Sequence, residues 1–408
     1  MTASDAASPS GAASDRALER VVRAESARIV AALTASLGNL DLAEESVAEA
    51  VAEALVSWRQ VGVPPNPGGW LTVAARRNAL DRLRRDQRYR KKLELLAGAP
   101  APSESAIDER VSLLFGCCHP ALTESAQLAL TLRAVCGLTT EQIARATMST
   151  PTAVGQRIVR AKRKIGAAGI PLRVPIGAER SPRLDVVLTV ISVMYNEAHL
   201  TAGGGAEANR DLAEDALWLA DVVAHALPSE PEALGLVALL KFHRSREPAR
   251  SFAGRIVLLA DQDRSRWDVG LQAEAHRALA AAAALRRPGR WQLQAAIAAC
   301  HSDARVFSET DWEQIIVLYD MLLAYDPSPV VRLNRAVALG ETGRREAALA
   351  EVEALEDEMV RFHLWHAVRA ELLRGLGREE EAIRALHTAH GLTTNEAERR
   401  LLRSRELC

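Results

Sequence analysis

Aromatic side chains are scarce in this chain of 408 residues, which has five Phe, seven Trp and four Tyr. Sandwiches and barrels draw heavily on aromatic and β-branched residues, whereas the abundant Ala, Leu, Glu and Arg favour helices. No run of alternating polar and apolar residues indicates a strand, and almost every segment has helical periodicity. The sequence therefore predicts an all-α fold.

Several targeting and catalytic signals are also missing. The longest apolar stretch, near Val186–Tyr195, is shorter than the roughly 20 residues that span a bilayer. The first fifteen residues lack the basic start and apolar core of a signal peptide, so we expect a disordered tail over 1–16. An odd number of cysteines, five, argues for a reducing compartment. We therefore expect a cytoplasmic protein with no membrane partner.

No phosphate loop, nucleophile elbow or metalloprotease motif is present, so we expect neither catalysis nor a cofactor. Cys117, Cys118 and His119 are adjacent, but no second pair of metal ligands has suitable spacing, and packing at a helix end is expected instead. The aspartates of Asp261–Asp268 alternate with arginines, which favours internal ion pairing that stabilises a turn over a metal or catalytic site.

Charge is unevenly distributed along the chain. The formal net charge of −1 divides into +6 for residues 1–173 and −7 for the remainder. Nine basic residues lie in Arg76–Lys92, and eight lie in Arg133–Arg173. Basic stripes separated by acidic helices indicate a polyanion-binding front half, although two solvated helix faces would look similar.

The front half contains a series of helix start signals. Residues 17–37 form a first helix, and Asp41 opens a second with a capping box to Glu44. Asn66 followed by Pro67 is a strong start for a third helix. Further along, Thr139 with Gln142 and Thr150 with Pro151 start a short helix and a basic second helix, which is the outline of a helix-turn-helix.

The helix after Pro151 is amphipathic. Its apolar side, Val154, Ile158, Ala161 and Ile165, is expected to face the preceding helices. Its polar side carries residues suited to base edges and phosphates in a major groove. These candidate DNA-binding residues are Thr152, Gln156, Arg157, Arg160 and Arg163.

The two helices before it carry opposite charge. Glu44, Glu45, Glu49 and Glu53 form an acidic face, which DNA would repel and a basic protein partner would attract. The helix that starts at Pro67 has a mostly outward basic stripe, within which Asp81 can orient an arginine. The stripe comprises Arg76, Arg77, Asn78, Arg82, Arg84 and Arg85.

The C-terminal part contains a repeat. Gly343-Arg344 and Gly377-Arg378 are 34 residues apart, and small or apolar residues match at the same offset. This period is typical of tetratricopeptide repeats, which we predict near 330–392.

Together the acidic helix, NPGGWL…ARRNALDRLRR and LTTEQIARATMSTPTAVGQRIVRAKRKI resemble regions 2 and 4 of a bacterial extracytoplasmic-function (ECF) RNA polymerase sigma factor. The remainder resembles the ECF subgroup that has a long helical, tetratricopeptide-containing extension. The resemblance implies region 2 at 17–94, a linker at 95–107, region 4 at 108–173, a linker at 174–182 and the extension at 183–408.

The resemblance also implies partners for particular residues. Glu44, Glu45 and Glu49 would contact core RNA polymerase, at the clamp helices of its β′ subunit, and the β subunit would be a further partner. The proline-rich loop ending at Asn66, with the basic stripe, would bind the −10 promoter element, and the helix after Pro151 would bind the −35 element. Ala48 and Val51 stand where the family often has Gln and Phe.

Two other interpretations remain open at this stage. The C-terminal part could bind a small molecule or carry an enzymatic activity that the front half targets to DNA, or its repeats could bind a protein or ligand that regulates the factor. The whole chain could also be a conventional helix-turn-helix regulator, a class that usually dimerises on palindromes without polymerase.

Overall fold

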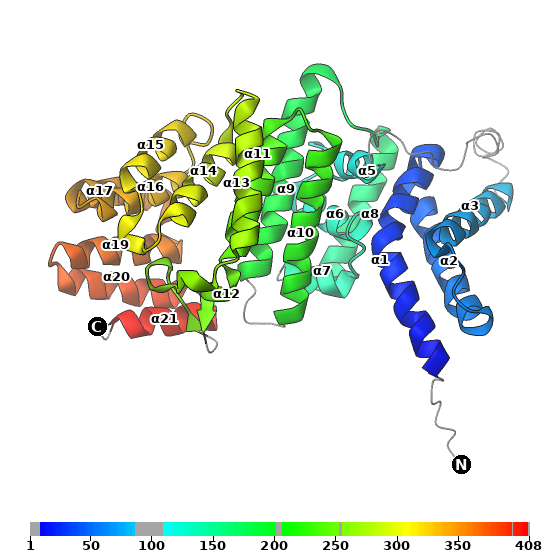
Figure 1. The fold of residues 1–408 in the computed structure, drawn as a ribbon, viewed down its shortest axis with the longest axis horizontal. Coiled ribbons are helices and arrows are strands. Elements are labelled where there is room, and N and C mark those ends of the chain that lie inside the picture. The colour runs from blue at the N-terminus through cyan, green and yellow to red at the C-terminus, as the bar shows by residue number, and fades with distance from the viewer. Residues whose placement is uncertain are drawn as a thin grey trace, which may run out of the picture. The chain divides into compact units, whose positions relative to one another are not determined.

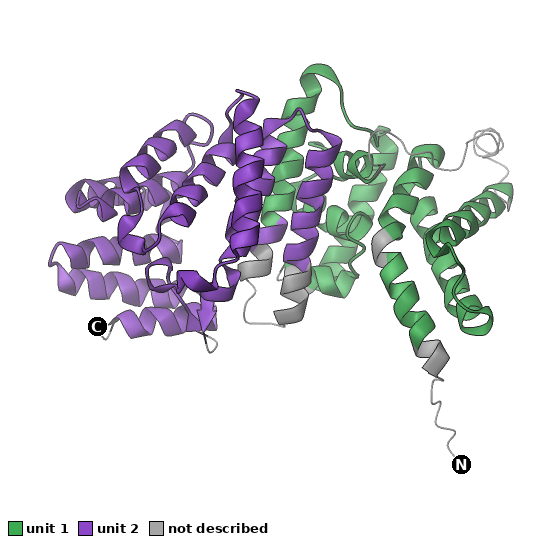
Figure 2. Ribbon diagram, in the orientation of Figure 1, with its two compact units in different colours: residues 1–193 green, residues 194–408 purple. Residues whose placement is uncertain are grey.

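The computed structural model describes residues 9–85, 109–147, 149–170, 172–200, 206–252, 255–393 and 395–406. Helices dominate these residues, which confirms the all-α prediction (Figure 1). Two compact units divide the chain between Val193 and Met194 (Figure 2). None of the described helices is both long enough and apolar enough to cross a membrane. The linker predicted at 95–107 falls outside the described residues.

Unit 1 begins with three helices that pack on one another: α1 (Pro9–Leu37), α2 (Leu40–Val61) and α3 (Pro67–Arg85). Their apolar stripes face inward, and the largest side chain in this core is Trp58, which is almost fully buried. The Trp58 ring meets Trp70 edge to face at 5.7 Å between centroids, which joins α2 to α3.

The start of the chain corrects the tail predicted at 1–16, because α1 already begins at Pro9. Two contacts hold its first turns against the end of α2. The buried Ser14 hydroxyl donates to the carbonyl oxygen of Trp58 at 3.2 Å. The Arg59 guanidinium binds the Asp15 carboxylate through two nitrogens at 2.8 and 2.6 Å.

The caps of α2 and α3 show one difference from expectation. Asn39, not Asp41, caps α2, since its Oδ1 accepts from the Leu42 amide at 3.1 Å. Asp41 instead lies in the first helical turn, where its negative charge is still favourable. The predicted start of α3 is confirmed, because Asn66 Oδ1 accepts from the Gly69 amide at 2.9 Å.

Four helices complete the second half of this unit: α5 (Glu109–Cys117), α6 (Glu124–Ala134), α7 (Thr140–Ala146) and α8 (Pro151–Ala168). Both predicted caps form here. The Thr139 amide donates to Gln142 Oε1 at 2.7 Å, and the Gln142 amide donates back to the Thr139 hydroxyl at 3.2 Å. The Thr150 hydroxyl accepts from the Ala153 amide at 3.2 Å at the start of α8. Helices α7 and α8 pack on each other and on α6.

The linker predicted at 174–182 is shorter than expected. After a short turn, η2 (Gly177–Glu179), helix α9 (Arg180–Leu200) begins at once. Arg183 anchors this start, because its Nη2 donates to the Phe115 carbonyl oxygen at 2.5 Å. The boundary between the two units therefore falls inside α9, later than the sequence predicted.

Unit 2 continues as a succession of helices interrupted by one small hairpin, in which Ser251 pairs with Ile256 and Phe252 with Arg255. Its first elements are α10 (Ala206–Ala226), α11 (Pro231–Ser245), α12 (Glu247–Arg250), β1 (Ser251–Phe252), β2 (Arg255–Ile256), η3 (Leu259–Asp261), η4 (Arg264–Arg266), α13 (Val269–Ala284) and α14 (Arg290–Asp303). Its remaining elements are η5 (Phe307–Glu309), α15 (Trp312–Leu322), α16 (Pro329–Glu341), α17 (Arg345–Glu353), α18 (Glu356–Met359), α19 (His363–Gly375), α20 (Glu379–Leu392) and α21 (Glu396–Glu406).

Two helix pairs in unit 2, α16–α17 and α19–α20, repeat at the 34-residue offset. Gly343 and Gly377 turn each pair with φ of 84° and 76°, a left-handed conformation that glycine adopts without strain. The residue after each glycine donates its amide to the carbonyl at the matching position, Leu339 in the first pair and Leu373 in the second. The burial pattern differs at Ile383, which is exposed although its counterpart Leu349 is buried, and it matches again at Val352 and Leu386.

Candidate nucleic-acid interface

Helix α8 is built from the core outward. Val154, Ile158, Ala161 and Ile165 recur at helical spacing and are all buried, as the sequence predicts. This packing against α6 and α7 fixes which side of α8 faces away from the protein. The helix starts at a capped threonine and ends at Gly169, whose left-handed conformation closes the last turn.

The outward side of α8 carries the expected polar residues. Thr152, Gln156, Arg160 and Arg163 are exposed. Arg157 is only partly exposed and donates to the Ser149 hydroxyl at 3.2 Å, so it is tied to the turn between α7 and α8. The side chains that remain accessible include hydroxyl, amide and guanidinium groups, which can bond to base edges and phosphates.

The sequence reasoning overlooked Val159, which lies between these polar residues and is 54% exposed. A valine on an otherwise polar helix face gives up favourable burial, and such a residue can contact the methyl group of thymine in a major groove. Its position one turn from Gln156 and Arg163 was readable from the helical spacing alone.

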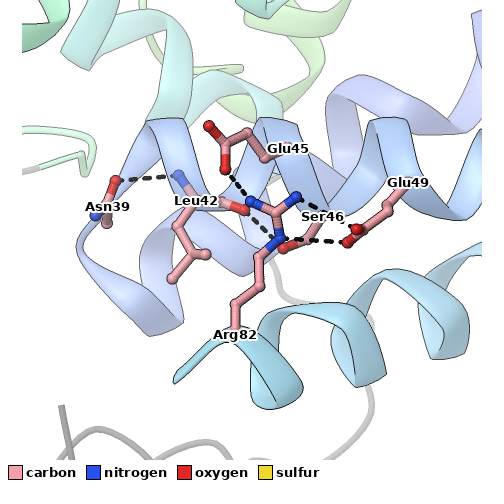
Figure 3. Close-up of polar contacts among 6 residues, drawn as sticks. All are labelled: Asn39, Leu42, Glu45, Ser46, Glu49 and Arg82. Carbon is pink, nitrogen blue, oxygen red and sulfur yellow. Dashed lines mark hydrogen bonds and ion pairs between the residues drawn. The ribbon is translucent and has the colours of Figure 1, made fainter. Parts of the chain in front are cut away.

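Ion pairs join the acidic helix α2 to the basic helix α3 (Figure 3). Arg82 bonds to Glu45 and also contacts both Glu49 oxygens at 3.3 Å. Farther along, Arg77 bonds to Glu53. The predicted polymerase-binding acids and the predicted −10-binding arginines are therefore neighbours that partly neutralise each other. These side chains are all more than a third exposed, so the pairs contribute little stability.

The structure corrects the assignment of Asn78, which was predicted to line the −10 element. Its side chain is only 7% exposed, because it follows the buried Leu71 by seven residues and Ala74 by four. Asn66 was also predicted to bind the −10 element. Its side chain is exposed, but its oxygen already accepts a hydrogen bond as the cap of α3.

The other members of the basic stripe differ in how far they are exposed to solvent. Arg76 is half-buried, whereas Arg84 is exposed and lies 3.4 Å from Asp81. The side chain of Arg85 lies outside the described part of the chain.

A further bond links α8 to α2 within unit 1. Lys162 Nζ lies 2.6 Å from Glu44 Oε2 and 2.9 Å from Asp41 Oδ1, and the lysine side chain is only 13% exposed. Burial lowers the pKa of Lys162, but the attraction of Glu44 and the bonds to Glu44 and Asp41 raise it further, so the net shift is upward. Lys162 is thus charged and engaged with protein, and Glu44 is 19% exposed beneath it.

Apolar residues also lie on the outer side of α2, and of these the sequence analysis named only Ala48. Ala48, Ala52, Leu55 and Val56 are exposed, with Val56 at 59%. They continue the face that carries Glu45 and Glu49, so this surface is acidic toward its start and apolar toward its end. Exposed apolar groups beside charges are a common composition for a protein-binding surface.

The signals set aside from sequence also find structural places. Cys117 and Cys118 are buried at the end of α5, as expected, and burial raises the pKa of both thiols, that of Cys118 to about 12. Asp263 and Asp268 bond to the amides of Ser265 and Leu271, so they stabilise their turns by capping rather than by the expected ion pairing. Among the described residues, no group of three or more His, Cys, Asp or Glu side chains could hold a metal.

Comparison with known proteins defines the class first. Residues 112–165, from α5 to α8, match the family described as "Sigma-70, region 4", and the chain is therefore a sigma-factor-like protein with a DNA-binding helix-turn-helix. Residues 183–283, from α9 to α13, match a family of unknown function, DUF6596.

A relative covers nearly the whole chain. An uncharacterized protein of Rhizobium meliloti (strain 1021) is 41% identical over 383 residues, which is 90% of this chain and 89% of that protein. The chain belongs to the same family as this protein.

Proposed function

We propose that the protein is an ECF-type sigma factor that binds core RNA polymerase, recognises −35 and −10 promoter elements and promotes melting of the −10 region. The region 4 match on a well-formed helix-turn-helix carries this proposal. The three-helix bundle before it supports region 2, because its α2 and α3 occur in the order that the resemblance requires. No catalytic step is part of this role, and we place it in the cytoplasm, where polymerase acts.

The −35 element would be read by α8. Thr152, Gln156 and Arg160 recur every four residues on its exposed side, and Arg163 extends that side toward the C-terminal half. In a helix-turn-helix, the N-terminal residues of the second helix reach base edges, while later basic residues approach phosphates. We therefore assign base contacts to Thr152 and Gln156 and mainly phosphate contacts to Arg163.

Core polymerase would bind the outer face of α2. Glu45 and Glu49 offer exposed carboxylates to a basic partner such as the β′ clamp helices, and the neighbouring Leu55 and Val56 offer apolar area. Glu44 would contribute only after its bond to Lys162 opens. We propose that polymerase binding and opening of this bond are coupled, because the Glu44 side chain is only 19% exposed while it is bonded to Lys162.

The −10 element would be bound by the loop before α3 and by the outward arginines of α3. Arg84 is accessible, whereas Arg77 and Arg82 are held by acids of α2. Those exposed bonds are weak enough for phosphates to displace them. Asn78 is dropped from the proposed set because it is buried.

Unit 2 would act as a regulatory extension. Its repeated helix pairs at a 34-residue offset support tetratricopeptide-like repeats, which bind protein or ligand partners on extended surfaces. The tetratricopeptide assignment rests on the shared turn geometry and the offset.

Run-off transcription with bacterial core polymerase on randomised promoter fragments tests the proposal. We expect transcripts that depend on the protein and share a two-part promoter motif. Arg160→Ala should lower transcription while reducing the penalty of −35 substitutions, whereas Arg28→Ala, an exposed charge change on α1, should do neither. No dependence for the wild type or for Lys162→Met, in which the bond to Glu44 is absent, would refute the sigma-factor role.

A further inference from the structure

Two arginines contact one tryptophan in unit 2, near the end of α11 and the β hairpin, and a third arginine lies close enough to repel one of them. The guanidinium carbons of Arg246 and Arg264 lie 5.3 and 4.7 Å from the centre of the Trp267 ring, which is 4% exposed. Arg250, at the end of α12, has its Nη2 3.3 Å from His243 Nδ1 and repels the charge of Arg246. We call Arg246, Arg250, Arg264 and Trp267 the arginine cluster.

Among the described residues, no carboxylate pairs with Arg246 or Arg250. The acids nearest in sequence bind elsewhere, since Glu247 pairs with Arg244 and Asp268 caps α13. Arg335, on α16, shows the usual arrangement for a part-buried arginine, with Asp320 and Glu351 both at 2.6 Å. Arg264 feels the attraction of Glu309, but Arg246 and Arg250 lack the carboxylate partner that partly buried arginines normally have.

Burial and the positive charge of the cluster lower the pKa values of nearby groups. Burial, and then repulsion from Arg250 and Arg264, lower the pKa of Arg246 to about 10. Burial, followed by the charges of Arg246 and Arg264, lowers the pKa of His301 to about 4. At neutral pH the arginines remain charged while His301 is neutral, so the local field is strongly positive.

The cluster also presents hydrogen-bond donors that have no acceptor. Within the part of the chain that the structure describes, four buried nitrogens of the cluster have no partner: Nε of Arg246, Nε of Arg250, Nη2 of Arg264 and Nε1 of Trp267. A buried donor without an acceptor is unfavourable, so a ligand that supplies acceptor oxygens would be stabilised there. Arg264 is nevertheless held in place, because its Nη1 donates to the carbonyl oxygens of His301 and Ala304 at 2.5 and 2.6 Å.

We propose that the arginine cluster binds a small phosphate-bearing anion, either inorganic phosphate or a phosphomonoester. A phosphate dianion supplies several acceptor oxygens and two negative charges, which match multiple guanidinium donors better than the single charge of a carboxylate. The arginines are partly exposed, so a small ligand can approach them from solvent and reach the buried donors once these side chains shift, whereas the buried indole and the surrounding helices leave no continuous open basic stripe for DNA. The site lies within the residues matching DUF6596 and is independent of the sigma-factor role.

Calorimetric titration of the full-length protein tests this site, with inorganic phosphate and glycerol 3-phosphate as probes at constant ionic strength in chloride. We expect saturable one-to-one binding. Arg246→Gln should weaken it by about 10- to 100-fold, as loss of charge-assisted hydrogen bonds implies. Arg255→Gln removes an exposed charge from the neighbouring strand β2 and should leave the affinity within about twofold.

Trp267→Phe keeps an aromatic ring for the arginines but removes the donor, and should weaken binding by about 3- to 10-fold. This variant decides the question even if Arg246→Gln fails to fold. Tighter binding of the phosphomonoester would identify a phosphorylated metabolite as the ligand, and equal binding would identify phosphate itself. Absence of saturable binding, equal binding of acetate, or unchanged affinity in Trp267→Phe would overturn the proposal.

Discussion

The bond between Lys162 and Glu44 offers the sharpest test of how the two halves of unit 1 interact. Both side chains are mostly buried and lie 2.6 Å apart, whereas Asp41, the second partner of Lys162, is 63% exposed and adds less. Exposed ion pairs contribute up to about 1 kcal/mol, and removing one partner of a fully buried pair costs about 3–5 kcal/mol. We therefore expect Lys162→Met to destabilise local structure by about 2 kcal/mol.

A double-mutant cycle separates the pair from other effects of the substitutions. Glu44→Gln combined with Lys162→Met removes both charges, and we expect a coupling energy of about 1–2 kcal/mol. Hydrogen exchange of the α2 and α8 amides is the measurement, because it reports local opening without requiring the whole chain to unfold in one step. Lys164→Met is the matched control, since Lys164 donates to the Ala121 carbonyl and not to α2.

The pH dependence provides a second check on the same pair. Because the folded pKa of Lys162 is raised, its contribution is fully present below the ordinary lysine pKa of about 10.4 and is lost as pH rises through the higher folded value. A coupling energy under about 0.3 kcal/mol, within the range of independent sites, would refute the reasoning. Equal protection of α2 in the Lys162 and Lys164 variants would do the same.

Three other predictions test separate parts of the structure. Burial depresses the pKa of His301 to about 4, so stability should fall as pH drops from about 6.5 toward 4, and His301→Gln should flatten denaturant-melt stability across that window. Gly343→Ala should destabilise unit 2 by about 1 kcal/mol, because the φ of Gly343 is 84°. Gly391→Ala in helix α20, where an added methyl meets open space, should stabilise unit 2 by about 0.5 kcal/mol. Thermal melts that rank the two variants in the opposite order would contradict this. Thr150→Ala should cost about 1 kcal/mol through loss of the α8 cap, while exposed Thr152→Ala should leave stability unchanged and weaken only promoter binding in a filter assay.

Local features of this protein were readable from the sequence because they depend on residues a few positions apart. The Thr139–Gln142 capping box and the cap at Thr150 formed as expected. The buried side of α8 followed from helical spacing. The equivalent turns at Gly343 and Gly377 followed from the 34-residue offset between them. Helical spacing also predicts the burial of Asn78, but its basic neighbours led to its assignment to the exposed stripe.

The partners of the charged side chains could not be predicted from the sequence. Acidic and basic residues were assigned to separate surfaces by composition, yet Arg82 bonds to Glu45 and Glu49 across the α2–α3 contact. Lys162 and Glu44 are 118 residues apart and meet only because α8 packs near α2. No pattern within either helix could predict this, since the choice of partner depends on how whole helices pack.

The amino-acid sequence by itself determined the helices, the caps of α3, α7 and α8 and the inward faces of the helices, because each follows from short-range hydrogen bonding and the 3.6-residue period. Tertiary structure decided which charges are neutralised and which are not. Arg82 pairs with two acids and Glu44 pairs with a lysine. Arg246 lies near other arginines, a tryptophan and Tyr195, with no acid partner among the described residues. Electrostatic energy depends on distance and burial in space, and those quantities exist only once the helices have packed.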